Sequence, residues 1–565
     1  MIDASRFEVR WFEECRAELK REFDQSYKPQ FREIFDHFRP RRGFYVRDES
    51  SRSAGGGKVH GGKVNEKVVN STTLRVSKNA QSGLQAGVTS PSRPWKKLGP
   101  PTSDLKKQPG VNEFFDETDR RMDYVLAKSN FYRATHTSYG DFVDVGVAAL
   151  QIDEHETDVI RCQVHPIGSW FAATNADGRV DVFYRDYNPT GHELLSQFSL
   201  EELPEKLHAD IKRMPFKRFE IRNAIEPNPF YRDDVPVIGI AAFKYISVWW
   251  CKGYDKKFIR VHGYHEFPVM VFRMAKSENG DAYGYGCGQD ALPDAKQLMF
   301  LEDQKCEAVD KMVTPPMQAP TALKTGGGVS LVRGKVTYHD GPGKIESLYN
   351  VNLPIQYVQA DIEIIQQRLS EHFFEDLFLM ITQSVQRQTT AREIEERHEE
   401  KLIMLGPVLE SINDELLDPA IERIIGIMRR ASMLPQAPPS LEGVDFKVEY
   451  ISILAQAQRA IQTIAIEQGV NFTSATAQAG WIEALDKLNV DATIDEYWDR
   501  IGFPAKAARP EAEILQIREA RNQKQSQADN LAMAGEAAKV AQAGAAAASQ
   551  QIQPNIMNAL LAGAA

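Results

Sequence analysis

Cysteine is scarce in this 565-residue chain, and no two cysteines lie close together. An odd number of widely separated cysteines, without a C-x-x-C pair, predicts neither a disulfide framework nor a cysteine-rich zinc site. The pattern is typical of a protein that folds in a reducing cytosol. The five residues are Cys15, Cys162, Cys251, Cys287 and Cys306.

Long apolar runs are also missing. The first fifteen residues, MIDASRFEVRWFEEC, carry charges throughout and lack the apolar centre of a secretory signal. No stretch of the sequence is both long and apolar enough for a membrane-spanning helix. We therefore expect neither secretion nor a membrane partner.

Enzyme motifs are absent or incomplete. Residues 57–63 nearly match the phosphate-binding loop G-x-x-x-x-G-K-[ST], but Val64 replaces the hydroxyl residue that binds Mg²⁺. His262, His265 and Glu266 have metal-binding side chains, but positions three apart on a strand point to opposite faces. G-x-S-x-G and H-E-x-x-H patterns do not occur. We expect no catalytic residue, no cofactor and no metal.

Positive charge is too sparse for a protein that coats nucleic acid. The chain has 68 Lys and Arg against 78 Asp and Glu, a formal net charge of −10. Tight binding to nucleic acid depends on many contacts between cations and phosphates. The composition does not exclude a protein along which nucleic acid slides. A hydrophobic fraction of 42% is enough for real cores, and the length allows about three to five structural units.

Hydrophobic spacing predicts an α+β protein that is mainly helical. We expect helix over residues 1–40, a Gly, Ser and Lys-rich flexible insertion at 50–67, and an interrupted helical region over 80–135. From Asp141 to Gly280 the sequence changes to short β-rich runs, with a hairpin turn at 175–178.

Two long helices are predicted next, at 290–313 and 355–381, with a Gly and Pro-rich connection between them. The second helix carries one apolar stripe at helical spacing. A capping box at 390–393 starts another helical region, and residues 445–505 indicate a strand followed by compact helices. The stripe consists of Val358, Ile362, Ile365, Leu369, Phe373 and Leu377.

The segment 382–389 lies between strong helices and has a single charged residue, Arg387. One interpretation is a plain surface loop. The other is a loop that touches a polyanion weakly and without sequence preference, because amides and hydroxyls can hydrogen-bond phosphates. The residues alone do not decide between the two. The candidate contacts are Gln383, Ser384, Gln386, Arg387, Gln388 and Thr389.

Several segments, in order along the chain, resemble the portal, or head-to-tail connector, family of short-tailed bacteriophages. They are NST (70–72) with SGLQAGVTSPSRPW (82–95), YG (285–286) with DALPD (290–294), KMV (311–313) with PP (315–316), TTA (389–391) with Arg397 and Lys401, LGPVL (405–409), ELLDP (415–419), and EYIS (449–452) with LAQAQRA (454–460). One segment alone would be weak, whereas the ordered set is fairly specific.

The resemblance implies an architecture of wing, two-helix stem, clip and helical crown, assembled as a ring around a central channel. On this chain it implies a wing at 1–289, stem helices at 290–313 and 355–381, a clip at 314–354, a channel loop at 382–389, long wing helices at 390–440, a crown at 441–510 and an Ala and Gln-rich tail or barrel helix at 511–565. The insertion at 50–67 has no place in the family pattern.

The resemblance further implies that the chain is a portal protein in the virion, at the head-tail junction, and in the host cytoplasm during assembly. The expected partners are further copies in a ring of twelve, double-stranded DNA in the channel, the large terminase motor, a tail adaptor, and the major capsid and scaffolding proteins. Clip cations expected to meet the motor or the adaptor are Lys324, Arg333, Lys335 and Lys344.

Two other functions remain open from the sequence. A tail or internal core protein of the virion would share long helices and a β module but would not need a closed ring. A metal-dependent DNA enzyme would need an acidic cluster, and none here has the spacing of one.

Overall fold

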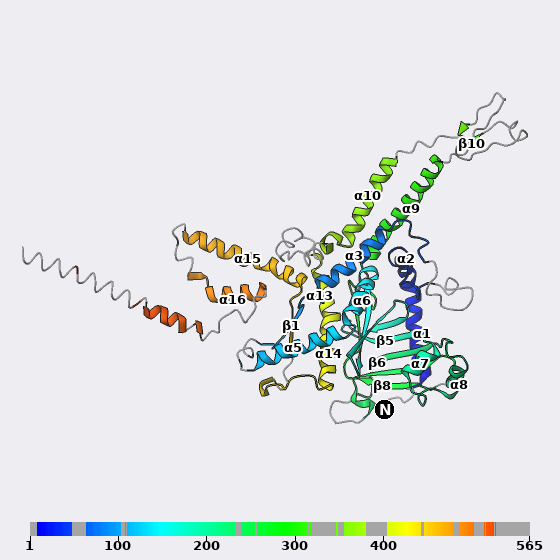
Figure 1. Ribbon diagram of the computed structural model, residues 1–565, viewed down its shortest axis with the longest axis horizontal. Helices are drawn as coiled ribbons and strands as arrows, with labels where there is room; N and C mark the ends of the chain where they lie inside the picture. Colours follow the sequence, from blue (N-terminus) through cyan, green and yellow to red (C-terminus); the bar gives the residue numbers. More distant parts are fainter. Residues whose placement is uncertain are drawn as a thin grey trace, which may run out of the picture. The chain divides into compact units, whose positions relative to one another are not determined.

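The computed structural model consists of two compact units, residues 1–479 and 480–565 (Figure 1). It is a mixed α/β chain that is mainly helical, as the sequence predicts. The residues that it describes are 8–47, 64–102, 105, 108, 110–231, 239–254, 257–278, 280–313, 317–318, 346–347, 355–379, 404–441, 446–478, 481, 486–501, 513–514, 516–524, 526 and 539.

The amino-terminal helical region is two helices rather than one. Helix α1 spans Val9–Ser26 and α2 spans Lys28–Phe38. Pro29 occupies the first turn of α2, where its missing N–H costs no hydrogen bond. Phe23 of α1 packs on Phe31 of α2 and on Phe171 of the neighbouring sheet. These aromatic contacts hold α1 against both.

The β module contains two antiparallel sheets (Figure 1). The first has the order β3-β2-β9, with β2 at Val147–His155, β3 at Val159–His165 and β9 at Val269–Arg273. The second has the order β4-β5-β6-β7-β8. Its strands are Trp170–Thr174, Val180–Tyr187, Ile221–Pro227, Tyr245–Cys251 and Arg260–Tyr264.

The predicted change to β structure at Asp141 is wrong by six residues. Helix α6, Phe131–Val145, continues through that point and ends at Gly146, which has a φ of 81°. The alternation Val143-Asp144-Val145 mimics a strand, but the whole turn is buried and both neighbouring aspartates have arginine partners. The strand β2 follows only after this left-handed glycine.

Two short helices were not expected in the β module. Helix α7 spans Gly191–Gln197 and α8 spans Glu205–Arg213. A capping box of Thr190 and Glu193 starts α7. Both helices lie together beside the five-stranded sheet (Figure 1) and contribute to a second hydrophobic core that is separate from the main one. That core contains Leu194, Phe198, Leu203, Leu207, Ile211, Phe219, Ile221, Trp249, Cys251 and Ile259.

The remaining body elements join distant parts of the sequence. Helix α3, Thr72–Gly87, packs on α6, and α5 spans Val111–Lys128. The strand β1, Lys96–Gly99, pairs antiparallel with β12, Lys447–Tyr450, as the predicted strand near 445 allows. A 3-10 turn occupies Ile240–Ala242 and another Pro439–Leu441.

The helical region after 404 contains a π-helical insert. Helix α13 spans Gly406–Ile412, the π-helix η5 spans Asn413–Leu417, and α14 spans Asp418–Arg430. Pro407 and Pro419 are the second residues of α13 and α14. Because the helical backbone runs without a break from α13 through η5 into α14, Pro419 removes one hydrogen-bond donor next to the π-turn.

Helix α15 spans Ile453–Gln478 at the end of the first unit. In the second unit, α16 spans Val490–Ile501, and the Asn489 side chain accepts the N–H of Ala492 at its start. All five cysteines are free. Within the described ranges, every helix is too short or too polar to cross a bilayer.

Candidate functional site

The residues predicted to contact DNA or docking partners lie outside the described part of the chain. This applies to the loop 382–389 and to Lys324, Arg333, Lys335 and Lys344. Between the two long helices, only β10, Met317–Gln318, and β11, Glu346–Ser347, are described. They pair antiparallel, which brings the two ends of this long connection together.

The two long helices form an antiparallel pair, here called the helix pair (Figure 1). Helix α9 spans Cys287–Val313 and α10 spans Ile355–His372. Asp294 is 3.3 Å from the Arg368 guanidinium and 3.4 Å from His372 Nε2, near one end of the pair. Near the other end, Lys305 donates to Gln359 Oε1 at 3.3 Å. These contacts fix an antiparallel register.

The apolar stripe predicted for the second helix faces the interior, with one break. All its members except half-buried Val358 are buried. The expected helix 355–381 ends as α10 at His372, because Phe374 takes a φ of 53°, and a short helical turn follows to Leu379. The break lets Phe373 pack on Phe38, with ring centroids 5.1 Å apart, and so ties the helix pair to α2.

Large apolar side chains remain exposed on the outside of the helix pair. Phe300 is 62% exposed, Ile364 is 56% exposed and Tyr357 is 73% exposed. Tyr357 and Ile364 are seven residues apart and therefore share one side of α10. Phe300 lies on α9 between the half-buried Leu301 and the buried Met299. Exposed apolar patches of this kind mark contacts with other chains.

The helix pair is acidic. Helix α9 carries six carboxylates and three lysines, and α10 carries three carboxylates and one arginine. The lysines of α9 mostly neutralise acids of this same chain: Lys296 pairs with Glu33 of α2, Lys305 with Glu302 and Lys311 with Glu307. The hydrogen bond from Lys296 lowers the pKa of Glu33. The surface of the pair is therefore repulsive to polyanions.

A cluster of glycines lies where the β module meets the helix pair, within residues 284–288. A Cβ on Gly286 would lie 2.5 Å from the backbone nitrogen of Gly146. The Gln289 side chain accepts from Gly286 N and donates to the Val145 carbonyl, both at 3.0 Å. The junction is thus held by close backbone contact with the end of α6 rather than forming a free hinge.

Replacing Gly288 with alanine is expected to destabilise the protein, although alanine normally favours a helix by about 1 kcal/mol. The new Cβ would lie 2.0 Å from the Asp144 carbonyl oxygen. Such overpacking typically costs about 1–3 kcal/mol. Thermal unfolding of Gly288→Ala measures the effect, and Gly280→Ala is the matched control, because its nearest neighbour atom is 4.0 Å away. An unchanged or raised Tm for Gly288→Ala would contradict the close contact.

Buried ion pairs hold α6 against the segment that follows α2. Arg42 contacts both oxygens of Asp141, and Arg39 Nε lies 2.8 Å from Asp144 Oδ2. Both aspartate side chains are fully buried. Burial raises the pKa of Asp144, and the charge of Arg39 opposes that rise. Ser77 of α3 also donates to Asp144, so three helices meet at this point.

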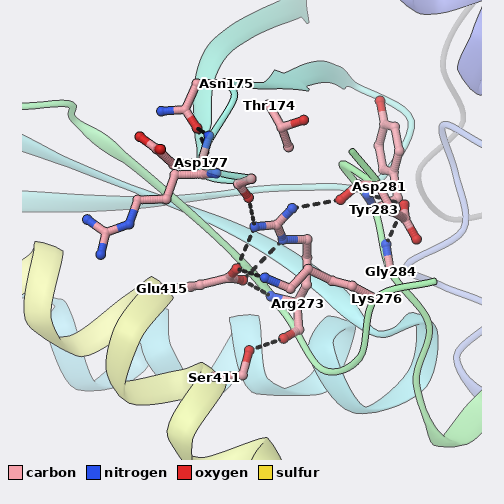
Figure 2. A network of polar contacts seen from close by, with 12 residues as sticks. Thr174, Asn175, Asp177, Arg273, Lys276, Asp281, Tyr283, Gly284, Ser411 and Glu415 are labelled. Carbon is pink, nitrogen blue, oxygen red and sulfur yellow. Dashed lines mark hydrogen bonds and ion pairs between the residues drawn. The ribbon is translucent and has the colours of Figure 1, made fainter. Parts of the chain in front are cut away.

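A second buried ion pair joins the β module to the π-helix (Figure 2). Arg273 at the end of β9 is fully buried, and its Nε lies 3.1 Å from Glu415 Oε2. The backbone nitrogen of Arg273 donates to the same carboxylate oxygen at 2.8 Å. Lys276 adds a contact at 3.0 Å from the more exposed side, and Ser411 of α13 donates to the Arg273 carbonyl.

The other donors of Arg273 reach two further segments (Figure 2). Nη2 donates to the Gly178 carbonyl at 2.8 Å, in the hairpin between β4 and β5, and Nη1 donates to the Asp281 carbonyl at 2.6 Å. The Asp281 carboxylate accepts from the backbone of Tyr283 and Gly284. Burial alone would raise the pKa of Asp281, but these backbone hydrogen bonds keep it below its usual value. One side chain thus links both sheets, the π-helix and the segment that leads into α9.

The candidate metal ligands do not converge. Glu266 accepts from Arg423 at 2.7 Å and from Arg430 at 2.9 Å, so its carboxylate is neutralised by α14. His262 and His265 each pack on the Phe243 ring. In the part of the chain that the structure describes, no group of three or more His, Cys, Asp or Glu is arranged to hold a metal.

Sequence reasoning did not find Arg273 or Glu415. They are 142 residues apart, and each looks locally like an ordinary charge beside an apolar run. The one available signal was an arginine that directly follows the continuous apolar strand Val269–Phe272. A charged side chain at the buried end of a strand needs a counter-charge or hydrogen-bond partners.

Comparisons with known proteins cover most of the chain. The profile of the family described as "Bacteriophage head to tail connecting protein" matches residues 13–508. A portal protein of Salmonella phage epsilon15 is 34% identical over 529 residues, which is 92% of this chain and 92% of that protein. A probable portal protein of Bordetella phage BPP-1 is 33% identical over 527 residues, with the same coverage of both chains.

Among solved structures, the virion of a native gene transfer agent particle contains a chain with 11% sequence identity and a TM-score of 0.28. The similarity covers 66% of this chain and 89% of that chain. A likeness at that level supports no statement about this protein.

Proposed function

Because the chain belongs to the family of bacteriophage head to tail connecting proteins and has the portal role at the capsid vertex, we propose that twelve copies form a closed ring. Double-stranded DNA would pass through its central channel during packaging and ejection. The helix pair would be the stem of each subunit, residues 1–289 and 390–440 the wing, 314–354 the clip, and 441–510 the crown. The family is structural rather than enzymatic.

The exposed apolar side chains of the helix pair are the main observation in favour of a ring. A heterologous ring requires each subunit to present two different surfaces to its two neighbours. Phe300 on α9 and the Tyr357–Ile364 side of α10 are two such surfaces, and their exposure in a single chain is otherwise unfavourable. The partner that would cover them is a second copy of this chain.

The acidic character of the helix pair supports passage of DNA rather than tight binding. Carboxylates that line a channel repel phosphate, so the duplex would stay centred and would not adhere to the wall. Grip would then be confined to the loop 382–389, where repeated Arg387 side chains would form a sparse positive belt among amides and hydroxyls. Such contacts carry no base specificity.

Replacing Gln386 and Arg387 together with alanine is expected to reduce DNA retention in filled heads without reducing ring assembly. The change removes one positive charge per subunit from the belt and leaves the helix pair untouched. A packaging assay that compares retained genome length in variant and unchanged heads measures the effect. Replacing Gln383 and Ser384 with alanine is the matched control, which leaves the charge in place. Full retention by the Gln386→Ala, Arg387→Ala variant would contradict gripping by this loop.

The energy for packaging would come from a separate motor. The near match to a phosphate-binding loop at 57–63 lacks the hydroxyl that coordinates Mg²⁺. Lys324, Arg333, Lys335 and Lys344 would contact this terminase and later the tail adaptor. Other contacts would be with the major capsid and scaffolding proteins, first in the host cytoplasm and finally in the virion.

Light scattering combined with negative-stain microscopy of the purified chain tests the ring directly. The expected result is a particle of twelve subunit masses with a central hole. A stable monomer, even after addition of capsid and scaffolding proteins, would contradict the proposal, and a different closed number would correct the stoichiometry alone.

A further inference from the structure

A second exposed surface lies far along the chain from the helix pair and outside the proposed function. Residues 212–218 are seven consecutive exposed residues that begin with the last two residues of α8 and continue into the connection to β6, with the sequence Lys-Arg-Met-Pro-Phe-Lys-Arg. Phe216 is 79% exposed and Met214 is 42% exposed. Four cations therefore flank two exposed apolar side chains. This segment is called the basic turn below.

The backbone of the basic turn is fixed. Lys217 N donates to the Met214 carbonyl at 3.1 Å, which closes a four-residue turn, and Pro215 is in its second position, where proline is favoured. The carbonyls of Pro215 and Lys217 accept from His192 N at 2.8 Å and Gly191 N at 3.0 Å. These are amides of the first turn of α7, which have no partner within their own helix.

Further contacts hold the turn from its carboxyl side. Arg218 bridges to Thr190, and its guanidinium donates to the Asn188 carbonyl at 2.9 Å. Beneath the turn, Ile211 and Phe219 are buried in the second core. A Cβ at Gly191 would lie 3.0 Å from the Pro215 carbonyl oxygen, so the basic turn packs closely against the start of α7. The Phe216 ring is thus presented on a rigid support.

The charge of the basic turn is not neutralised within the described residues. No ion pair in those ranges involves Lys212, Arg213, Lys217 or Arg218. The neighbouring carboxylates have other partners: Glu193 caps α7, Asp210 accepts from Tyr254, and Glu220 pairs with Lys252. Lys212 and Arg213 suit the carboxyl end of α8. Lys217 and Arg218 lie beyond that helix, where Lys217 Nζ is 5.5 Å from the Phe219 ring centroid and Arg218 donates to a backbone carbonyl, contacts that provide no counter-charge.

We propose that the basic turn docks an acidic protein segment that inserts an apolar side chain beside Phe216. An aromatic residue on a rigid support is the type of residue that dominates binding energy at protein interfaces. Its fixed conformation reduces the ordering cost of binding. The flanking cations would select carboxylates by charge complementarity. A duplex DNA partner is disfavoured, because phosphate contacts alone give no role to exposed Met214 and Phe216.

Fluorescence anisotropy of the full chain with three labelled probes tests the proposal. The probes are a short synthetic helical peptide with Glu on one face and Leu and Phe on the other, the same peptide with the apolar residues changed to serine, and a DNA duplex of similar length. We expect the first peptide to bind and the second to bind at least about tenfold more weakly. Failure of the first peptide to bind, or equal or tighter binding of the duplex, would overturn the proposal.

Two variants locate the binding to the basic turn. Phe216→Ser and the double change Lys212→Glu with Lys217→Glu should each weaken binding of the first peptide by about tenfold or more. Lys78→Glu with Lys97→Glu, at two exposed positions on α3 and β1, is the control of equal charge change and should leave it unaltered. Equal loss in the control would mean nonspecific attraction and would also overturn the site. Ring formation should be normal in all variants, which separates this result from the proposed function.

Discussion

Glu415→Gln is expected to lower the free energy of unfolding by about 3–5 kcal/mol, because it leaves the fully buried Arg273 guanidinium without its counter-charge. Glutamine keeps the size of the side chain and can still accept one hydrogen bond. The loss is therefore one of charge compensation rather than of packing. Chemical denaturation followed by far-UV circular dichroism measures it, and the midpoint should fall without a change in the native spectrum.

Two further variants make the Glu415 result specific. Lys276→Gln removes only the more exposed contact of the same carboxylate and should cost less than about 1 kcal/mol. Arg273→Met combined with Glu415→Leu removes both charges and should recover much of the loss, since an apolar pair of similar volume can replace a buried ion pair. If Glu415→Gln proved as mild as Lys276→Gln, the Arg273 junction would not have the central role given to it here.

Phe300→Asp combined with Ile364→Asp should convert the assembled particle to monomers, which is the largest functional effect expected from any surface change in this chain. Both side chains are more than half exposed in a single subunit, so the monomer should fold normally. In a ring, each aspartate would be buried against a neighbour without a partner, and the cost would repeat at every interface. Light scattering gives the mass directly.

Leu195→Asp combined with Leu200→Asp is the control for the Phe300 and Ile364 variant. These two leucines are also exposed, they lie outside the helix pair, and the change adds the same formal charge. Rings should persist in the control and be absent in the aspartate variant. Rings that survive the aspartate change would show that the subunit contacts lie on another surface, although the family membership of the chain would stand.

Periodic signals predicted the helix pair well, because its interior is built from residues close in sequence. The stripe from Ile362 to Leu377 is buried as expected. The same stripe could not reveal the end of α10 at His372, because the left-handed backbone at Phe374 accompanies a contact between Phe373 and Phe38, which lies more than three hundred residues earlier in the chain. Local spacing contains no information about such a partner.

The β module shows a second limit of prediction from sequence, which is a buried strand that contains polar residues. The strands β4, β5, β7 and β9 correspond to apolar runs in the sequence, whereas β6 has no such run. The sequence of β6, Ile-Arg-Asn-Ala-Ile-Glu-Pro, has three polar residues among seven, yet it is the central strand of its sheet, and its Asn223 and Arg222 are buried. Asn223 donates to Ser247 and to the Val248 carbonyl of β7. Buried polar residues with partners in the next strand look like loop residues when only the sequence is read.

The candidate functional residues were also only partly predictable from the sequence. The family segments identified the chain over most of its length, because an ordered set of short motifs survives where single motifs are ambiguous. The loop 382–389 and the four clip cations remain predictions, since they lie outside the described residues. The glycine cluster near 286 is visible in the sequence. Its close contact with the end of α6 could be found only from the structure. The sequence does not distinguish a glycine that permits a bend from a glycine that permits close contact.

The π-helix η5 has one consequence for how the chain tolerates changes in length. A π-turn accommodates one residue more than the α-helical path between the same two ends. Deleting a single residue within 413–417 would therefore restore an unbroken α-helix instead of leaving a gap. The segments on either side would keep their relative orientation, and only the residues within the π-turn would change position. Glu415 could then no longer face Arg273 while Leu416 and Leu417 remain in the core. Among relatives, a chain one residue shorter at this place should also lack the arginine at the end of the strand equivalent to β9.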